Sequence, residues 1–221
     1  MKYSKVFIVG GIIFASEIVW HLYKRFGCLW IKSRNSKKAS RTNVHELKQD
    51  ISEVMFFSKE SSLCRVHIIS GEACLRNSCP VGYLRKLESY INLSKETLDV
   101  CMYALTCHLL SNAMVDAHKR GVFVRIITDH RMACNEAAQT TLFHKNGMAI
   151  KFENFDVLMH HKFVIVDNSI IITGSTNWTM GAFFGNFDHV LVTNQRLLVQ
   201  PFVEEFNRLW KIFSKSEENI R

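Results

Sequence analysis

The sequence lacks an internal repeat and a biased composition, and its number of cysteines is odd. Its 221 residues are 48% hydrophobic and 22% charged, which is ordinary for globular proteins and argues against disorder along the whole chain. The seven cysteines do not have the pattern of a secreted disulfide framework, so we expect most of them to be small buried side chains in a reducing compartment. An excess of negative charge is also absent. The formal charge of +8 favours a polyanionic partner, either a nucleic acid or an anionic lipid surface.

Residues 1–24 are predicted to form a transmembrane anchor. Residues 6–23 are almost entirely apolar, and a helix over them would extend roughly 27 Å at about 1.5 Å per residue, close to the thickness of a bilayer core. Glu17 and His21 weaken this interpretation, because ionisable groups are costly inside a membrane. The absence of a small-residue cleavage site disfavours a signal peptide, and a buried or peripheral amphipathic helix is the other alternative. More Lys and Arg follow the apolar run than precede it, which places the following residues in the cytosol.

Residues 25–51 are polar and basic and are expected to be a tether, so the folded body is predicted to span residues 52–221. In this body, short β-branched runs alternate with longer amphipathic stretches, which is typical of an α/β fold with helices on both faces of a sheet. Asp167 and Asn168 separate two apolar runs and predict a tight hairpin, so we expect a mixed sheet. The predicted strands are 98–103, 122–128, 149–153, 163–167, 169–174 and 189–193, and the predicted helices are 82–92, 109–120, 135–145 and 197–213.

A candidate catalytic segment runs from His160 to Asn177 and reads HHKFVIVDNSIIITGSTN. His160 and Lys162 are two residues apart at the start of a predicted strand, so both project from one face and His161 from the other. A neutral imidazole can attack phosphorus and later release the phosphoryl group, while a nearby cation neutralises the phosphate oxygens. After the next strand, a glycine lets the backbone approach a substrate, and Ser175 and Asn177 offer hydrogen-bond donors.

These residues fit the pattern H-x-K-x4-D-x6-G-S-x-N, and on this pattern the chain resembles the phospholipase D superfamily. The resemblance implies that His160 forms a phosphohistidine, that Lys162 and Asn177 hold the phosphate, and that no catalytic metal is needed. Ser175 is expected to support the site. Asp167, at the hairpin, is expected to be a structural or orienting residue rather than a proton donor. The matched positions are His160, Lys162, Asp167, Gly174, Ser175 and Asn177.

The superfamily also places an acidic residue at the start of the strand after this motif, and Asp188 occupies that position. A carboxylate there would fix the tautomer of the nucleophilic histidine, and the alternative is a surface aspartate that caps the strand. The family uses two copies of the motif, in which one histidine attacks and the other protonates the leaving oxygen, whereas this sequence contains one copy. We therefore expect an isologous homodimer with the active site at the twofold interface.

A separate group of metal-binding side chains precedes the first predicted helix. Cys64, His67, Cys74 and Cys79 have the spacing C-x2-H-x6-C-x4-C in a short irregular stretch, and four such ligands suit structural zinc. From the residues alone, thiols without a metal and an exposed histidine are an equal alternative. The resemblance favours zinc, because similar family members carry a Cys/His zinc element at this place, and it predicts a zinc element over residues 64–79.

The single motif, the apolar N-terminus and the Cys/His group resemble the Zucchini family, also called mitochondrial cardiolipin hydrolases, over nearly the whole chain. The stretches HHKFVIVD, ITGSTNWT and EEFNRLW carry this resemblance. The sequence Gly185-Asn186-Phe187 before Asp188 departs from the family pattern and leaves the contacts of that loop open. The resemblance implies a single-pass protein of the mitochondrial outer membrane with its catalytic domain in the cytosol.

Two substrates compete within that family. The first is single-stranded RNA, cut by an endonuclease in the production of PIWI-interacting RNAs, with proteins of that pathway as partners. Arg125, Lys145 and Lys151 are candidates for following the RNA backbone. The second is cardiolipin, which is hydrolysed to phosphatidic acid at the mitochondrial surface. The net positive charge suits both, and the resemblance favours RNA. A catalytically silent mitochondrial scaffold is a third hypothesis, against which the intact motif argues.

Overall fold

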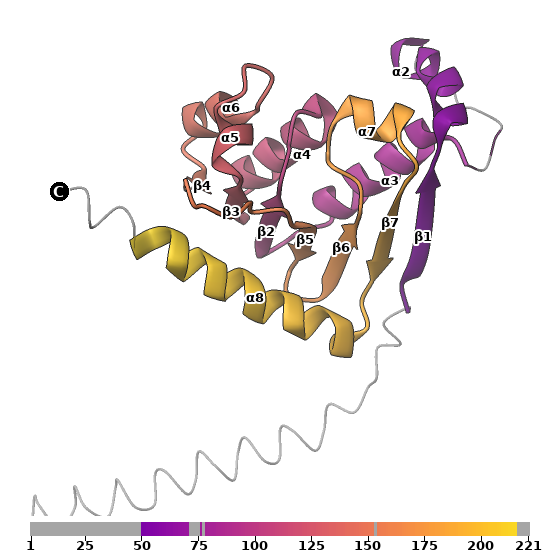
Figure 1. Cartoon of the computed structure of the whole chain (residues 1–221). Coiled ribbons are helices and arrows are strands. Elements are labelled where there is room, and N and C mark those ends of the chain that lie inside the picture. Colours follow the sequence, from indigo (N-terminus) through magenta and orange to yellow (C-terminus); the bar gives the residue numbers. More distant parts are fainter. Residues whose placement is uncertain (1–49, 71–75, 77, 153, 216–221) are drawn as a thin grey trace, which may run out of the picture. The chain divides into compact units, whose positions relative to one another are not determined.

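The computed structural model describes residues 50–70, 76, 78–152 and 154–215 (Figure 1). The predicted anchor over residues 1–24 and nearly all of the predicted tether over residues 25–51 lie outside these ranges. No helix within the described ranges is long and apolar enough to cross a membrane. The described residues group into one compact unit.

A mixed sheet of seven strands forms the centre of this unit in the described residues (Figure 1). The strands are β1 (Ser52–Phe57), β2 (Thr97–Met102), β3 (Phe123–Thr128), β4 (Ala149–Lys151), β5 (Lys162–Val166), β6 (Ile170–Gly174) and β7 (Asp188–Thr193). They lie in the order β1-β7-β6-β5-β2-β3-β4. The pairs β2–β3 and β3–β4 are parallel and the other neighbours are antiparallel. The predicted mixed sheet is therefore confirmed.

The central hairpin joins β5 to β6 through Asp167 and Asn168. Both residues have positive φ angles, 51° and 50°, like the two central residues of a type I′ turn, and the Ser169 N–H closes the turn on the Val166 carbonyl at 2.9 Å. Aspartate and asparagine adopt this left-handed region more readily than most residues. The tight hairpin predicted at these two residues is confirmed.

Helices cover both faces of the sheet, as the sequence predicted. The helical elements are η1 (Lys59–Cys64), α2 (Val66–Ser70), α3 (Pro80–Asn92), α4 (His108–Lys119), α5 (His130–Ala133), α6 (Thr140–Lys145), α7 (Met180–Gly185) and α8 (Arg196–Lys215). Figure 1 shows α8 along one face and α3, α4 and α7 on the other. On β5, Val164 and Val166 belong to the core beneath α3, α4 and α7, whereas Phe163 and Ile165 belong to the core beneath α8, as the alternation of strand side chains requires.

Two local predictions differ from the structure. The helix predicted over residues 135–145 is confirmed only in its second half, as α6. Its first half is a turn, in which Asn135 accepts a hydrogen bond from the Ala137 N–H, and such a bond competes with helix formation. The strand β1 was not predicted at all. Its exposed positions include Val54 and Phe56, which are 50% and 68% exposed, so the alternation of apolar and polar residues that indicates a half-buried strand is missing.

Candidate active site

Three neighbouring strands bring the candidate catalytic residues to one edge of the sheet. His160 and Lys162 lie at the start of β5, Ser175 follows the end of β6, and Asp188 begins β7. Because β6 pairs antiparallel with both β5 and β7, the start of β5, the end of β6 and the start of β7 are adjacent. Residues from separate parts of the motif thus meet at this edge.

His160 and Lys162 form the first half of the site. Lys162 Nζ lies 3.2 Å from His160 Nδ1 and 3.4 Å from His160 Nε2, and it donates a hydrogen bond to the His160 carbonyl at 2.9 Å. The Tyr103 ring contacts both residues: its centroid is 4.5 Å from that of the imidazole and 5.1 Å from Lys162 Nζ. The imidazole is exposed, so this arrangement can present a nucleophile and a cation to the same phosphate.

Ser175 and Asp188 form the second half of the site. Ser175 Oγ donates to Asp188 Oδ1 at 2.6 Å and accepts from the His189 N–H at 3.1 Å. Asn186 Nδ2 donates to Asp188 Oδ2 at 3.1 Å, so both carboxylate oxygens have partners. Within the described residues Asp188 makes no hydrogen bond to His160, and the predicted orienting contact is therefore absent from a single subunit.

Electrostatics couple the two halves. Partial burial lowers the pKa of Lys162, and the negative charge of Asp188 opposes that shift. The Asp188 carboxylate thus helps to keep Lys162 protonated. A protonated Lys162 is what a phosphodiester substrate requires, because its oxygens carry negative charge.

Gly174 allows β6 and β7 to approach closely at the site. A Cβ at this position would collide with the backbone carbonyl of His189, so no other residue fits without displacing a strand. Nearby, the side-chain oxygen of Asn177 is buried and has no hydrogen-bond partner among the described residues. Buried amide oxygens are seldom unpaired, so Asn177 retains unused hydrogen-bonding capacity beside the other motif residues.

Asp167 is the one motif residue that the structure keeps apart from the others. It follows the opposite end of β5 from Lys162, roughly 16 Å away along the strand at about 3.3 Å per residue. Its carboxylate accepts hydrogen bonds from the backbone N–H groups of Lys95, Glu96 and Thr97 at 2.8 to 3.2 Å. These bonds join the hairpin to the start of β2, which is a structural function and leaves Asp167 no contact with the reacting groups.

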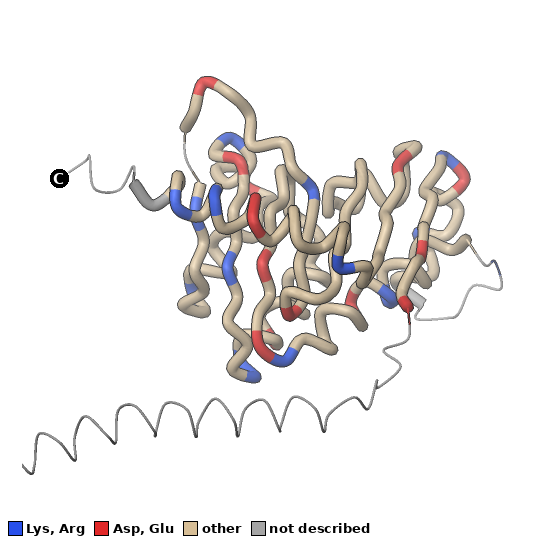
Figure 2. The backbone as a smooth tube through the Cα atoms, turned by 90° about the horizontal axis from the view of Figure 1, so that it is seen from below, with Lys and Arg blue, Asp and Glu red and all other residues tan. Residues whose placement is uncertain are grey.

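Arg125 does not occupy the position expected of a residue that follows an RNA backbone. Its guanidinium makes two hydrogen bonds of 2.7 Å to Asp99 and lies 4.8 Å from the centroid of the Phe206 ring of α8. It is therefore packed between the sheet and α8, and the prediction for Arg125 is wrong. Lys145 is exposed, whereas Lys151 Nζ lies 4.5 Å above the Trp210 ring. Figure 2 shows Lys and Arg positions interspersed with Asp and Glu along the described chain.

Three residues of the site were missed from the sequence. Tyr103 follows β2 and reaches His160 because β2 and β5 pair antiparallel. His189 and Asn186 flank Asp188, and both contact the Ser175–Asp188 pair. The sequence before Asp188 departs from the family pattern at Asn186. This departure was the available signal, because the Asn186 side chain in this loop holds the Asp188 carboxylate. No local signal marked Tyr103, because its contact depends on strand pairing.

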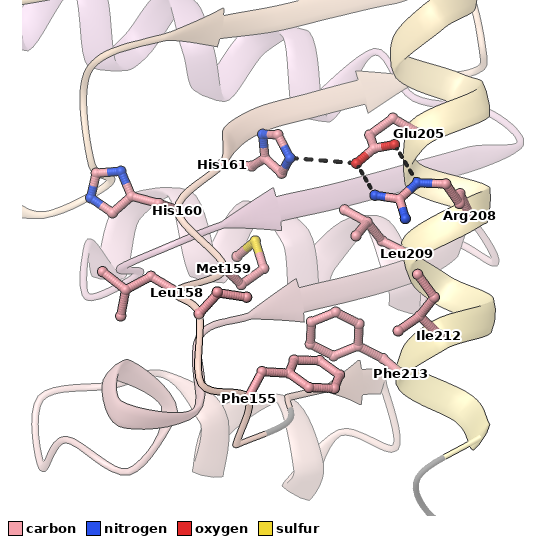
Figure 3. A pocket seen from close by; sticks show the side chains of 11 residues that line it. Phe155, Leu158, Met159, His160, His161, Glu205, Arg208, Leu209, Ile212 and Phe213 are labelled. Carbon is pink, nitrogen blue, oxygen red and sulfur yellow. Dashed lines mark hydrogen bonds and ion pairs between the residues drawn. The ribbon is translucent and has the colours of Figure 1, made fainter.

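An apolar groove begins at His160 and follows α8 (Figure 3). Its volume is about 520 Å³, within the range of roughly 300–1,000 Å³ that is usual for small-molecule sites. One end also holds His161, Glu205 and Arg208, where Glu205 accepts from Arg208 at 2.7 Å and lies 3.6 Å from His161 Nε2. The lining residues are Phe155, Val157, Leu158, Met159, His160, His161, Glu205, Arg208, Leu209, Ile212 and Phe213.

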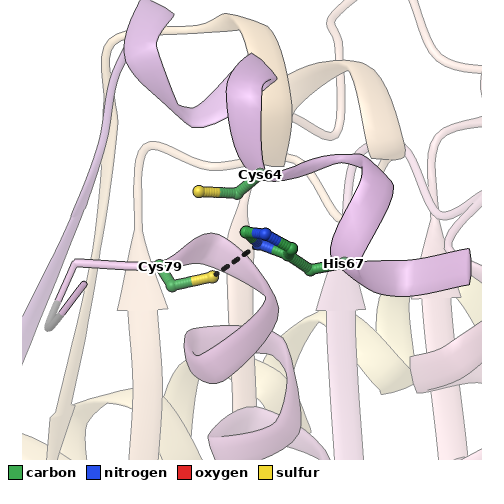
Figure 4. Close-up of side chains that lie close together, drawn as sticks. All are labelled: Cys64, His67 and Cys79. Carbon is green, nitrogen blue, oxygen red and sulfur yellow. Dashed lines mark hydrogen bonds between the residues drawn. The ribbon is translucent and has the colours of Figure 1, made fainter. Parts of the chain in front are cut away.

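A compact group of metal-binding side chains lies at the start of α3 (Figure 4). The ligand atoms of Cys64, His67 and Cys79 all lie within 4.8 Å of one another, and His67 Nδ1 is 3.9 Å from Cys79 Sγ. Both of these cysteines are buried and His67 is half-buried. Cys74, the fourth predicted ligand, lies outside the described residues. Two thiols and an imidazole that converge on one point are suitable ligands for zinc, so this donor set fits the predicted metal.

Comparison with known proteins assigns the family. Residues 87–210 match the family described as "Cardiolipin synthase, PLD-like domain". A mitochondrial cardiolipin hydrolase of Chlamydomonas reinhardtii is 31% identical over 171 residues, which cover 76% of each chain. Another, of Xenopus tropicalis, is 31% identical over 168 residues, which cover 74% of this chain and 79% of the relative.

The fold is shared with a solved phospholipase D family member, Nuc from Salmonella typhimurium. The TM-score is 0.58 at 24% sequence identity, and the match covers 74% of this chain and 95% of that one. This similarity concerns the fold alone, and the sequence relatives carry the assignment. The chain therefore belongs to the phospholipase D superfamily, in the Zucchini or mitochondrial cardiolipin hydrolase family, and it is a phosphodiester hydrolase of the phospholipase D and nuclease type.

Proposed function

We propose that the chain cleaves its substrate through a phosphohistidine formed on His160. The imidazole attacks phosphorus, so that a P–N bond forms and a P–O bond breaks, and the leaving oxygen takes a proton from His160 of the partner subunit. Water, deprotonated by the partner's His160, then attacks phosphorus and releases the first histidine. Lys162 and Asn177 hold the phosphate oxygens, and Ser175 supports the site through its hydrogen bond to Asp188. The observation that carries this proposal is the position of Lys162 Nζ, 3.2 Å from an exposed imidazole.

The proposed reaction requires a homodimer, because one chain supplies one motif. Within the described chain His160 has no carboxylate partner, since Asp188 bonds to Ser175 and Asn186 instead. Exposed aromatic side chains flank this region: Phe187 precedes Asp188 and is 80% exposed, and Phe56 lies opposite His189. Large exposed apolar side chains are typical of protein interfaces, so this surface suits a second copy.

Mixed dimers test the shared site. Wild-type chains combined with an excess of His160→Ala chains should lose activity per wild-type chain, because the heterodimer contains only one His160 side chain. Mixing with the surface variant Lys119→Ala, whose side chain is 64% exposed, is the control for dilution. Undiminished activity per wild-type chain in heterodimers would rule out the shared site.

We propose an anionic phospholipid of the cardiolipin type as the substrate, cleaved to phosphatidic acid at the surface of the mitochondrial outer membrane. The relatives named mitochondrial cardiolipin hydrolase support this choice, and so does the apolar groove that begins at His160. This ranking reverses the one expected from the sequence, because Arg125 pairs with Asp99 and is not exposed to a nucleic acid.

Single-stranded RNA is the second candidate, with proteins of the piRNA pathway as partners. Arg131 on α5 and Lys145 on α6 are exposed cations that an RNA backbone would contact. The two candidates are separated by offering the purified dimer labelled single-stranded RNA and cardiolipin vesicles side by side, with His160→Ala as the control. Cleavage of the vesicles supports the lipid, and cleavage of RNA alone supports the nuclease.

We also propose that Cys64, His67, Cys74 and Cys79 hold one structural zinc ion. The ion would fix η1 and α2 to the start of α3 and takes no part in the proposed reaction. Purified protein should contain about one zinc per chain, and Cys79→Ser should reduce both the zinc content and the Tm. Cys134→Ser is the matched control, because Cys134 is exposed and belongs to another part of the fold. Equal zinc content in both variants would contradict the proposal.

A further inference from the structure

The apolar groove exposes several neighbouring hydrocarbon side chains to solvent. Val157 is 75% exposed, Leu158 is 50% exposed and Ile212 is 38% exposed. Phe155 and Phe213 pack edge to face, with their ring centroids 5.1 Å apart, at the end away from the histidines (Figure 3). Scattered exposed apolar residues are ordinary on soluble proteins, whereas a contiguous set around a concave surface indicates a binding site.

The position of the groove restricts what can occupy it. His160 lines one end, so an occupant of the groove lies next to this residue. From Glu205 to Phe213 the groove wall formed by α8 is about 12 Å long, at about 1.5 Å per residue. A groove that ends at His160 is suited to hold part of a substrate whose phosphodiester lies at that residue.

We propose that the apolar groove binds one acyl chain of a phospholipid substrate while the phosphodiester of that lipid lies at His160. The inference rests on the proposed phospholipid substrate and adds the place where its chain is held. Burial of hydrocarbon against apolar side chains is favourable in proportion to the area removed from water. The charged side chains at the histidine end of the groove pair with each other, because Arg208 donates two hydrogen bonds of 2.7 Å to Glu205.

The same lining is unsuitable for a nucleotide chain. Proteins that bind single strands stack bases on open aromatic faces and contact phosphates with unpaired cations. In the groove Phe155 and Phe213 pack against each other, and Arg208 is engaged by Glu205. Neither arrangement offers what a base or a phosphate requires, so the groove favours hydrocarbon.

The test compares the cleavage of long-chain and short-chain substrates by the full-length protein in detergent micelles. Wild type should cleave tetraoleoyl cardiolipin with a higher kcat/KM than tetrabutanoyl cardiolipin. The double variant Val157→Ser/Leu158→Ser removes apolar surface, and Ile212→Trp fills the groove. Each should lower the ratio of long-chain to short-chain kcat/KM at least about tenfold, because each buried methylene contributes roughly fourfold. Leu197→Ser is the control, since Leu197 is 91% exposed on α8 and does not line the groove.

The possible outcomes distinguish a failure of the acyl-chain site from a failure of the proposed phospholipid substrate. If wild type cleaves cardiolipin and the groove variants keep its chain-length ratio, the acyl-chain site is wrong and the phospholipid substrate stands. If the variants lose activity on both cardiolipins in equal proportion, the groove serves the fold or holds another segment of this chain, and the inference is again wrong. If wild type cleaves bis(p-nitrophenyl) phosphate but neither cardiolipin, the proposed substrate fails and the acyl-chain site fails with it.

Discussion

Among single residues, Lys162 has a charge that depends on its surroundings. Burial lowers its pKa, and the Asp188 carboxylate acts in the opposite direction. Activity should therefore decline on the alkaline side at a lower pH than an ordinary lysine would dictate, because the cation is lost as the pH rises through the lowered pKa. Asp188→Asn removes the opposing charge and should move this decline to still lower pH. The pH profile of kcat/KM measures the effect.

The control for this profile is Lys162→Arg. A guanidinium remains charged throughout the accessible pH range, so whatever activity this variant retains should show no alkaline decline from this group. An alkaline limb at the same pH in wild type and Asp188→Asn would show that the carboxylate does not influence Lys162.

The ion pair between Arg125 and Asp99 makes a second prediction, concerning stability. Asp99 is 1% exposed, and its burial raises the pKa of the carboxyl while Arg125 counteracts the rise. Arg125→Met should lower the free energy of unfolding by about 3 kcal/mol, because it leaves a buried carboxylate unpaired. The double variant Arg125→Met/Asp99→Leu should recover most of that loss, as replacement of a buried pair by apolar side chains often does. Urea denaturation gives both values, and a wild-type stability for the single variant would contradict the buried-pair interpretation.

At the scale of elements, the approach of β6 to β7 assembles the second half of the site. Gly174→Ala places a Cβ against the His189 carbonyl and should separate the two strands. Ser175, which bonds to both Asp188 and the His189 N–H, would move with β6. We expect kcat to fall on the order of tenfold to a hundredfold, because small displacements of catalytic groups have large effects. Overpacking should also lower the unfolding free energy by about 1–3 kcal/mol.

The matched control for Gly174→Ala is Gly181→Ala in α7. The nearest atom to a Cβ there is Thr179 Oγ1 at 3.9 Å, so an added methyl has room and alanine suits a helix. Gly181→Ala should keep wild-type activity and stability. If Gly174→Ala did the same, the close contact between the strands would not be needed for catalysis.

The elements that the sequence predicted correctly depend on neighbouring residues. Asp167 and Asn168 specify their hairpin by their own backbone preferences, and the apolar runs on either side define β5 and β6. The parts that were missed depend on distant contacts. β1 is a strand because it pairs with β7, and Tyr103 belongs to the site because β2 lies beside β5. Arg125 lies between the sheet and α8, and this position could not be predicted because no local sequence pattern reveals how α8 packs.

For the whole molecule, the proposed homodimer makes the candidate site one half of a larger one. The sequence predicted a dimer because it contains one copy of a motif that the family uses in pairs, and the structure adds a candidate surface for it. In an isologous dimer each residue of the interface occurs twice, so one substitution removes two contacts. Phe187 and Phe56 are 80% and 68% exposed and adjoin Asp188 and His189. Replacing either one should leave the fold of a single chain intact, since neither is buried in it.

Phe187→Asp and Phe56→Asp should each convert the dimer to a monomer and reduce phosphodiesterase activity in parallel. Burial of a phenylalanine contributes about 1.5–3 kcal/mol, and an aspartate in its place would bring two like charges to the symmetric interface. Analytical ultracentrifugation measures the oligomeric state, and bis(p-nitrophenyl) phosphate reports the chemistry without a lipid surface. Leu197→Asp, at a side chain 91% exposed on α8, should remain dimeric and active. Fully dimeric, active forms of both phenylalanine variants would place the twofold axis away from β1 and β7. Monomers with undiminished activity would mean that one chain completes the site alone.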